Sequence, residues 1–194
     1  MALAKLCGEM SGSTIIYVPG IKPKPPADQH RAQLWRCLLE GVRRANPPAA
    51  PLLAAYPECF ELVSWAPLFY RTQRDLALDL PGIERLLRLP RAEERDLREA
   101  VSWSRRLTQR FYLLSDLIPP LMQLAARTEL KITLRDTMRY LGNEDGLALK
   151  VRQMITDALL AAWQAGDRVL LAGHSLGSVI AWDVLWELSH RFAV

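Results

Sequence analysis

Residues 169–188 read VLLAGHSLGSVIAWDVLWEL, and this stretch decides the fold that the sequence predicts. An apolar run at residues 169–172 is followed by the turn GHSLG at residues 173–177 and then by a long apolar segment. A short apolar run bounded by glycine is typical of a buried strand, and a longer apolar segment is typical of a helix. The stretch therefore predicts a strand, a sharp turn with Ser175 at its apex, and a helix.

The pattern Gly173-x-Ser175-x-Gly177 has a chemical meaning in that setting. A tight turn from strand to helix strains the backbone of the central residue and presents its hydroxyl above the C-terminal edge of the sheet. The flanking glycines remove side chains that would collide with the neighbouring strand and helix. The helix directs its N-terminus at the hydroxyl, which favours developing negative charge. Ser175 is therefore a candidate nucleophile, and the alternative is a glycine-rich turn with an incidental serine.

The rest of the chain predicts an α/β fold around this turn. Residues 14–18 are a β-branched and aromatic run that predicts a strand, and residues 60–65, FELVSW, are a second strand candidate. A helix is expected from a cap at Asp28 to the residue before Asn46, and another over residues 147–163, with Gly166 just beyond its end. This alternation of strands and helices predicts a short parallel sheet of about three strands, covered by helices on both faces.

Residues 68–141 form a long segment rich in Arg, Leu and Glu, interrupted by Pro119-Pro120. We expect several helices here, which together form a cap or insertion within one domain. Such a segment is typical of a lid over an apolar acyl pocket, although lids look alike for lipids, thioesters and small esters. Most of its charges are expected on a solvated face.

Residues 169–188 resemble the nucleophile elbow of the serine esterases and lipases that have the α/β-hydrolase fold. The run GHSLGS, followed by a helix that carries Asp183, is similar to intracellular lipases and phospholipases of the DDHD group. Residues 15–21, IIYVPGI, resemble the strand and loop that supply the oxyanion hole, with Pro19 where many members have a histidine.

The resemblance implies one α/β-hydrolase-like domain over residues 1–194, with residues 68–141 as its helical insertion. It implies a carboxylic ester hydrolase, lipase-like or esterase-like, that forms an acyl-enzyme on Ser175. The elbow would be Gly173, His174 and Gly177, and the backbone N–H groups of Leu176 and Ile21 would form the oxyanion hole. The substrate would be a small-molecule or lipid ester, and no metal or organic cofactor is implied.

The acid and the base of such a site are harder to find. The family order is serine, then acid, then histidine, but only 19 residues follow Ser175. His190 lies 15 residues on, roughly 22 Å along a helix, and Asp183 on the same helix is expected to be structural. His174 should point away from the hydroxyl. His30, near the start of the first helix, is a candidate base that breaks the family order.

These gaps leave three hypotheses. We expect the chain to be the N-terminal part of a longer serine hydrolase, incomplete at its C-terminus, with the strand at residues 168–172 left as an unpaired edge. The first alternative is a non-catalytic fragment or scaffold that pairs with a partner, or with itself, along that edge. The second alternative is an active hydrolase that takes its base from His30 or from a partner chain.

Composition narrows the classes of partner and compartment. The net charge is +4, the isoelectric point is near 9.1, and no block of like charges or nucleic-acid motif is present. Nucleic-acid binding is therefore not expected. No apolar run is long enough for a membrane span. Three widely spaced cysteines, without metal-site spacing or a secretory signal, favour the cytoplasm.

Overall fold

A three-stranded parallel sheet lies at the centre of the molecule, in the order β2-β1-β3. The computed structural model describes residues 12–89, 98 and 128–192. The strands are β1 (Ser13–Val18), β2 (Phe60–Leu62) and β3 (Arg168–Gly173). β1 pairs with β3 over its full length, from Ser13 opposite Arg168 to Val18 opposite Gly173. The expected short parallel α/β sheet with flanking helices is confirmed.

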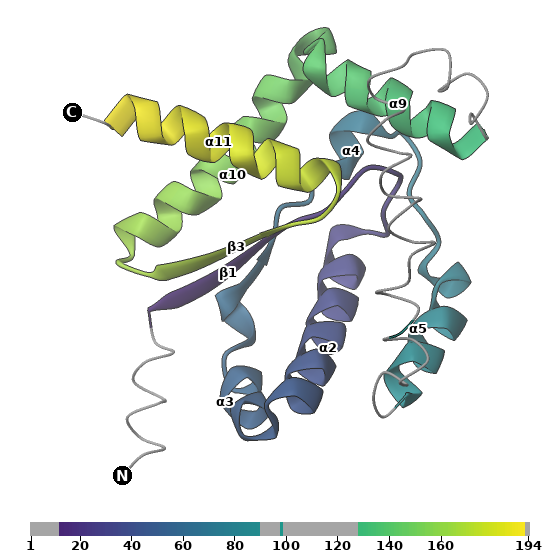
Figure 1. Ribbon diagram of the computed structural model, residues 1–194, viewed down its shortest axis with the longest axis vertical. Helices are drawn as coiled ribbons and strands as arrows, with labels where there is room; N and C mark the ends of the chain where they lie inside the picture. The colour runs from purple at the N-terminus through teal and green to yellow at the C-terminus, as the bar shows by residue number, and fades with distance from the viewer. Residues whose placement is uncertain (1–11, 90–97, 99–127, 193–194) are drawn as a thin grey trace.

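The helices pack in two groups around this sheet. α10 and α11 contact each other and both contact β1 and β3, whereas α2 contacts β2. Figure 1 shows α10 and α11 together on one side of the sheet and α2 on the other. The helices are α2 (Ala27–Ala45), α3 (Ala50–Ala54), α4 (Ala66–Phe69), α5 (Leu80–Arg88), α9 (Thr128–Leu141), α10 (Leu147–Gln164) and α11 (Leu176–Phe192), with short 3-10 helices η1 (Pro47–Ala49), η2 (Pro57–Cys59), η3 (Leu76–Leu78) and η4 (Glu144–Gly146).

The predicted helix ends agree with the structure at three of four places. α2 ends at Ala45, and Asn46 caps it through a backbone N–H bond to the Val42 carbonyl. α10 spans Leu147–Gln164, and Gly166 follows its C-cap with a φ of 76°, a left-handed conformation that favours glycine. The prediction for the start of α2 was wrong, since Asp28 lies in the first turn and Pro26 occupies the cap position without a side-chain bond.

β2 is shorter than residues 60–65 predicted. It ends at Leu62, and the chain then turns, with the Trp65 N–H donating to the Val63 carbonyl at 3.0 Å. The Trp65 side chain is fully buried, and its indole N–H donates to the Pro19 carbonyl at 2.8 Å. The Val63 N–H still donates to the Tyr17 carbonyl of β1 at 3.0 Å, but the side chains of Val63 and Trp65 belong to the core.

The core lies between β1 and the pair α10 and α11. Its fully buried aliphatic side chains come from those three elements: Ile16, Val18, Val151, Ile155, Ile180 and Val184. The expectation that the sheet is covered on both faces was wrong at β3. Val169 and Leu170 are 38% and 61% exposed, and successive strand residues face opposite sides. β3 is the sheet edge that the sequence predicted.

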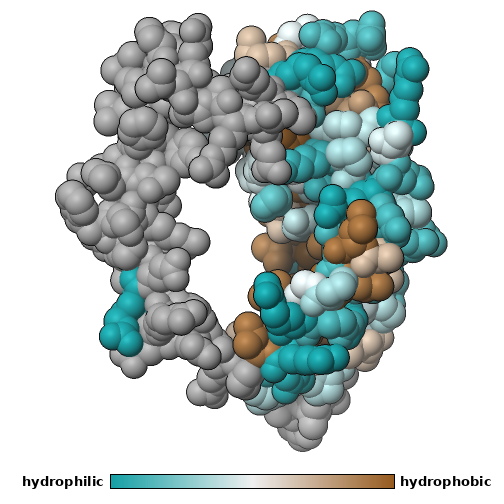
Figure 2. Space-filling view, turned by 90° about the vertical axis from the view of Figure 1, so that its right-hand side faces the viewer, coloured by the Kyte–Doolittle hydropathy of each residue, from teal (hydrophilic) through white to brown (hydrophobic). Residues whose placement is uncertain are grey.

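Part of the expected insertion lies outside the described residues, namely 90–97 and 99–127. The described part is helical, with the end of α4, then η3, α5 and α9. On the face seen in Figure 2, hydrophilic side chains dominate and apolar ones gather in its lower half. Exposed leucines of the η3–α5 region include Leu78 and Leu86. The single domain with a lid remains a prediction.

Candidate active site

Ser175 occupies the apex of the turn between β3 and α11. β3 ends at Gly173 and α11 begins at Leu176, so only two residues make the reversal. The φ of Ser175 is 55°, in the left-handed region that L-residues other than glycine rarely adopt. Such strain costs on the order of 1 kcal/mol or more and persists only where the surroundings enforce it. A nucleophile elbow requires such a strained backbone at the apex of its strand-to-helix turn.

The two glycines of the turn are required by close packing. A Cβ placed on Gly173 would lie 2.6 Å from the Cα of Ser178, inside any real contact distance. A Cβ on Gly177 would overlap the carbonyl oxygen of Val18 and lie 2.6 Å from that of Pro19. The first residues of α11 therefore press directly against the end of β1. This close approach explains the glycine spacing that the sequence displays.

The loop after β1, residues 19–24, passes directly beside Ser175. A Cβ on Gly20 would lie 2.9 Å from the Cβ of Ser175 and 2.9 Å from the carbonyl oxygen of His174. The His174 N–H donates to the Val18 carbonyl at 3.0 Å, which ties the two turns together. The Gly20–Ile21 peptide therefore lies beside Ser175, on the loop that was expected to supply the oxyanion hole.

The Ser175 side chain is exposed, and its hydroxyl has no hydrogen-bond partner among the described residues. The N–H of Leu176 is the first of α11, and the first N–H groups of a helix have no partner within it. α11 runs for 17 residues with its N-terminal end at Ser175. The partial positive charge of that end is available to stabilise an oxyanion.

None of the three histidines forms a hydrogen bond with Ser175 in the described structure. α11 continues without a break to Phe192, so His190 stays roughly 22 Å along the helix from the serine. Its ring stacks on Trp186 at 4.1 Å and its Nδ1 lies 2.8 Å from the Trp186 carbonyl oxygen. His174 is exposed, with its Nδ1 beside Gly20.

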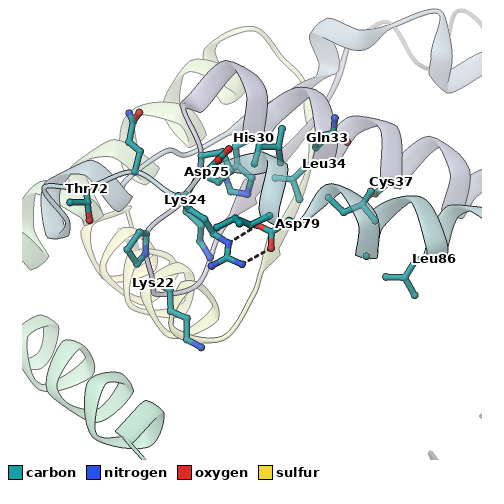
Figure 3. A pocket seen from close by; sticks show the side chains of 18 residues that line it. Lys22, Lys24, His30, Gln33, Leu34, Cys37, Thr72, Asp75, Asp79 and Leu86 are labelled. Atoms are coloured by element: carbon teal, nitrogen blue, oxygen red, sulfur yellow. Dashed lines mark hydrogen bonds and ion pairs between the residues drawn. The ribbon is translucent and has the colours of Figure 1, made fainter.

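His30 faces a separate cavity between α2 and α5. This open cavity of about 1140 Å³ is lined by His30, Gln33, Leu34 and Cys37 from α2 and by Ile83 and Leu86 from α5, among others, and its lining does not include Ser175. Figure 3 shows His30 beside this cavity with Lys24 and Asp75. Burial, with a smaller effect of the Lys24 ammonium, lowers the pKa of His30 to about 4. Its buried Nδ1 has no hydrogen-bond partner in the part of the chain that the structure describes.

Sequence reasoning missed two carboxylate–tyrosine pairs on α9. The Tyr140 hydroxyl donates to Asp183 at 2.7 Å, which joins α9 to α11 and gives Asp183 a structural partner. The Tyr70 hydroxyl donates to Asp136 at 2.7 Å and accepts the N–H of Lys22 at 2.8 Å. Burial and the bond to the carboxylate raise the pKa of both tyrosines. A lone tyrosine and a lone aspartate, 66 residues apart, carry no sequence signal of this kind.

Comparison with known proteins gave no match: no family model, curated protein or solved structure is similar to this chain. Among the described residues, no group of His, Cys, Asp and Glu could hold a metal ion. No described helix is long and apolar enough to cross a membrane. The geometry around Ser175 is therefore the basis on which a function is inferred.

Proposed function

We propose that this chain carries the nucleophile and the oxyanion hole of a serine hydrolase with the α/β-hydrolase fold, acting on carboxylic esters. The strained backbone of Ser175, at the apex of a turn whose glycines are sterically required, is the observation that carries the proposal. Tight packing of the 19–24 loop beside that serine and the α11 N-terminus behind it support the same assignment.

In this reaction the Ser175 Oγ attacks the ester carbonyl carbon, and the hydroxyl proton is passed on to the departing alcohol. The new Oγ–C bond replaces the C–O bond to the alcohol, and water then releases the acid from the acyl-enzyme. The N–H groups of Leu176 and Ile21 would bind the oxygen that becomes negative. The resemblance to lipases leaves the ester class open between lipids, thioesters and small esters.

The base of the reaction is the part that these residues do not supply. A general base must come within about 3 Å of the hydroxyl, and no described histidine is bonded to it. His30 is a poor base because its pKa of about 4 is far below the range in which proton abstraction is efficient. We therefore propose that the chain by itself is catalytically incomplete and reacts at Ser175 slowly.

An activity-based test suits a slow nucleophile. A fluorophosphonate probe should label the wild type through Ser175, because the probe reacts irreversibly and accumulates without turnover. Ser175→Ala should abolish labelling, whereas the control Ser178→Ala, three residues on in the same helix, should retain it. Equal labelling of the wild type and Ser175→Ala, or none of either, would contradict the proposal.

A second candidate function rests on the exposed edge of the sheet. Leu170 on β3 is 61% exposed, and Trp182 and Trp186 on α11 are 69% and 56% exposed. Two copies of one edge strand can pair antiparallel about a two-fold axis, which supplies a complement to the open edge. In this case the chain is a non-catalytic module that self-associates through β3, and its oligomeric state in solution tests the idea.

A further inference from the structure

The loop beside Ser175 contains a second strained residue. Lys22 has a φ of 82°, and a non-glycine residue in this region costs on the order of 1–3 kcal/mol. It lies one residue after Ile21, whose N–H is the proposed oxyanion donor. Something outside the loop must hold this conformation, because the strain by itself would drive the peptide to a more common geometry.

Tyr70 supplies that hold through its hydroxyl. The Lys22 N–H donates to the Tyr70 oxygen at 2.8 Å, across 48 residues of sequence. The same hydroxyl donates its one proton to Asp136 at 2.7 Å. Because that proton is committed to the carboxylate, an oxygen lone pair is left to face the Lys22 N–H.

Asp136 fixes the direction of the pair. It lies on α9, and its side chain is completely buried. Among the described residues, the guanidinium of Arg135 also lies near it, 3.4 Å away, which is beyond a good hydrogen bond. The short bond from Tyr70 is therefore the main interaction that compensates this buried carboxylate, and an oriented tyrosine results.

Other contacts hold the loop on either side of Lys22. The Trp65 indole N–H donates a hydrogen bond to the Pro19 carbonyl, and the Lys24 ammonium donates one to the Ile21 carbonyl at 3.0 Å. The Arg74 N–H donates to the Lys24 carbonyl at 3.0 Å. Tyr70 bonds the strained residue itself, and through Asp136 it connects the loop to α9.

We propose that Asp136 and Tyr70 are positioning residues that hold the 19–24 loop against Ser175 and so set the Ile21 N–H for the oxyanion. The inference has a structural half, that these residues hold the loop, which rests on the hydrogen bonds alone. Its catalytic half, that the held loop aids reaction at Ser175, rests on the proposed function. α9 belongs to the expected lid segment, so a shift of α9 would loosen the loop and lower the reactivity of the serine.

The structural half is tested by amide hydrogen exchange at Lys22 in the full chain. Tyr70→Phe removes the acceptor, and exchange at Lys22 should become roughly tenfold faster, the factor expected for one lost hydrogen bond. The matched control is Tyr140→Phe, which removes a tyrosine–carboxylate bond of the same 2.7 Å length that joins α9 to Asp183 of α11 rather than to Lys22. Equal changes at Lys22 in both variants, or none in either, would overturn the proposal.

The catalytic half is tested by the rate of fluorophosphonate labelling. Tyr70→Phe should slow labelling about tenfold or more, as expected for a misplaced oxyanion donor. Asp136→Asn keeps an acceptor for the tyrosine proton and should retain most of the wild-type rate, also where Tyr70→Phe fails to fold, and a folded Asp136→Asn that labels about tenfold more slowly would overturn the proposal. Tyr140→Phe should label at the wild-type rate.

The outcomes separate this inference from the proposed function. A wild type that is not labelled contradicts the proposed function and removes the catalytic role, while exchange at Lys22 still decides whether Tyr70 holds the loop. A labelled wild type with an unchanged rate in Tyr70→Phe leaves the proposed function standing and overturns the positioning role.

Discussion

Gly177 is the residue at which the turn around Ser175 meets the end of β1. Any Cβ at this position would overlap backbone oxygen atoms of Val18 and Pro19, and backbone cannot move aside as a flexible side chain can. We predict that Gly177→Ala destabilises the fold by about 1–3 kcal/mol, the usual cost of overpacking. Chemical unfolding at equilibrium measures this, and Gly82→Ala, whose Cβ would meet nothing, is the control. A neutral Gly177→Ala would contradict the packing described.

His30 gives the fold a dependence on acid. Its pKa is about 4 in the folded chain, against an ordinary value of 6.5. Above pH 6.5 the residue is neutral in both states, and between pH 6.5 and 4 only the unfolded chain takes up the proton, so stability falls as the pH falls. We predict that His30→Gln flattens this part of the stability profile.

Thermal unfolding from pH 7 to pH 4.5 measures the effect. The control is His190→Gln, which alters an exposed ring at the far end of α11. It should keep the wild-type slope, and a His30→Gln profile that is parallel to the wild type would show that burial does not hold His30 neutral.

At the scale of single helices, the same substitution should have opposite effects at two glycines. Gly41 lies inside α2 with open space around it, so Gly41→Ala should stabilise by about 0.5–1 kcal/mol through helix propensity. Gly166 follows α10 with a φ of 76°, so Gly166→Ala should destabilise by about 1 kcal/mol, although nothing crowds it. Thermal unfolding measures both effects: Gly41→Ala should melt above the wild type and Gly166→Ala below it. Shifts of the same sign would contradict this expectation.

The elements that sequence predicted well are those with a strong local cause. α10 shows a helical apolar stripe and a glycine stop, and β1 and β3 are short apolar runs with clear ends. β2 was overestimated because Val63 and Trp65 are as apolar as strand residues, yet their burial serves the core. Asp28 resembles a helix cap in sequence, but Pro26 fixes where α2 begins.

Part of the site could also be predicted, because its residues have a strong local cause in the sequence. Gly173, Ser175 and Gly177 lie within five consecutive residues of the chain, and their spacing encodes the turn. The link from Lys22 to Tyr70 and Asp136 joins three distant segments, so it depends on the tertiary fold and leaves no pattern of spacing. The sequence offered His30 as a candidate base, but His30 lines a separate cavity whose lining does not include Ser175.

Among the described residues, the sheet ends at β2 on one side and at β3 on the other, and β3 is the longer of these two edge strands. Leu170 is the most exposed large apolar residue of β3, and Trp182 on α11 is also exposed. If the edge pairs with a second copy, Leu170→Lys should shift the chain toward the monomer, because a charge on an edge opposes strand addition. Light scattering across a dilution series measures this, and Arg152→Lys is a conservative control on α10.

A wild type that stays monomeric at the highest concentrations, with Leu170→Lys unchanged, would contradict self-association. The serine hydrolase proposal would be untouched by that result, since Ser175 lies at the opposite end of β3 from Arg168 and its environment is built within one chain.

We propose that the fold makes Ser175 a nucleophile. Mass spectrometry after fluorophosphonate treatment tests it most directly, with the modified residue located by peptide fragmentation. We expect one adduct per chain, on Ser175 and not on Ser178 in the same peptide. An unmodified chain, or adducts spread over other exposed serines at equal rates, would contradict it.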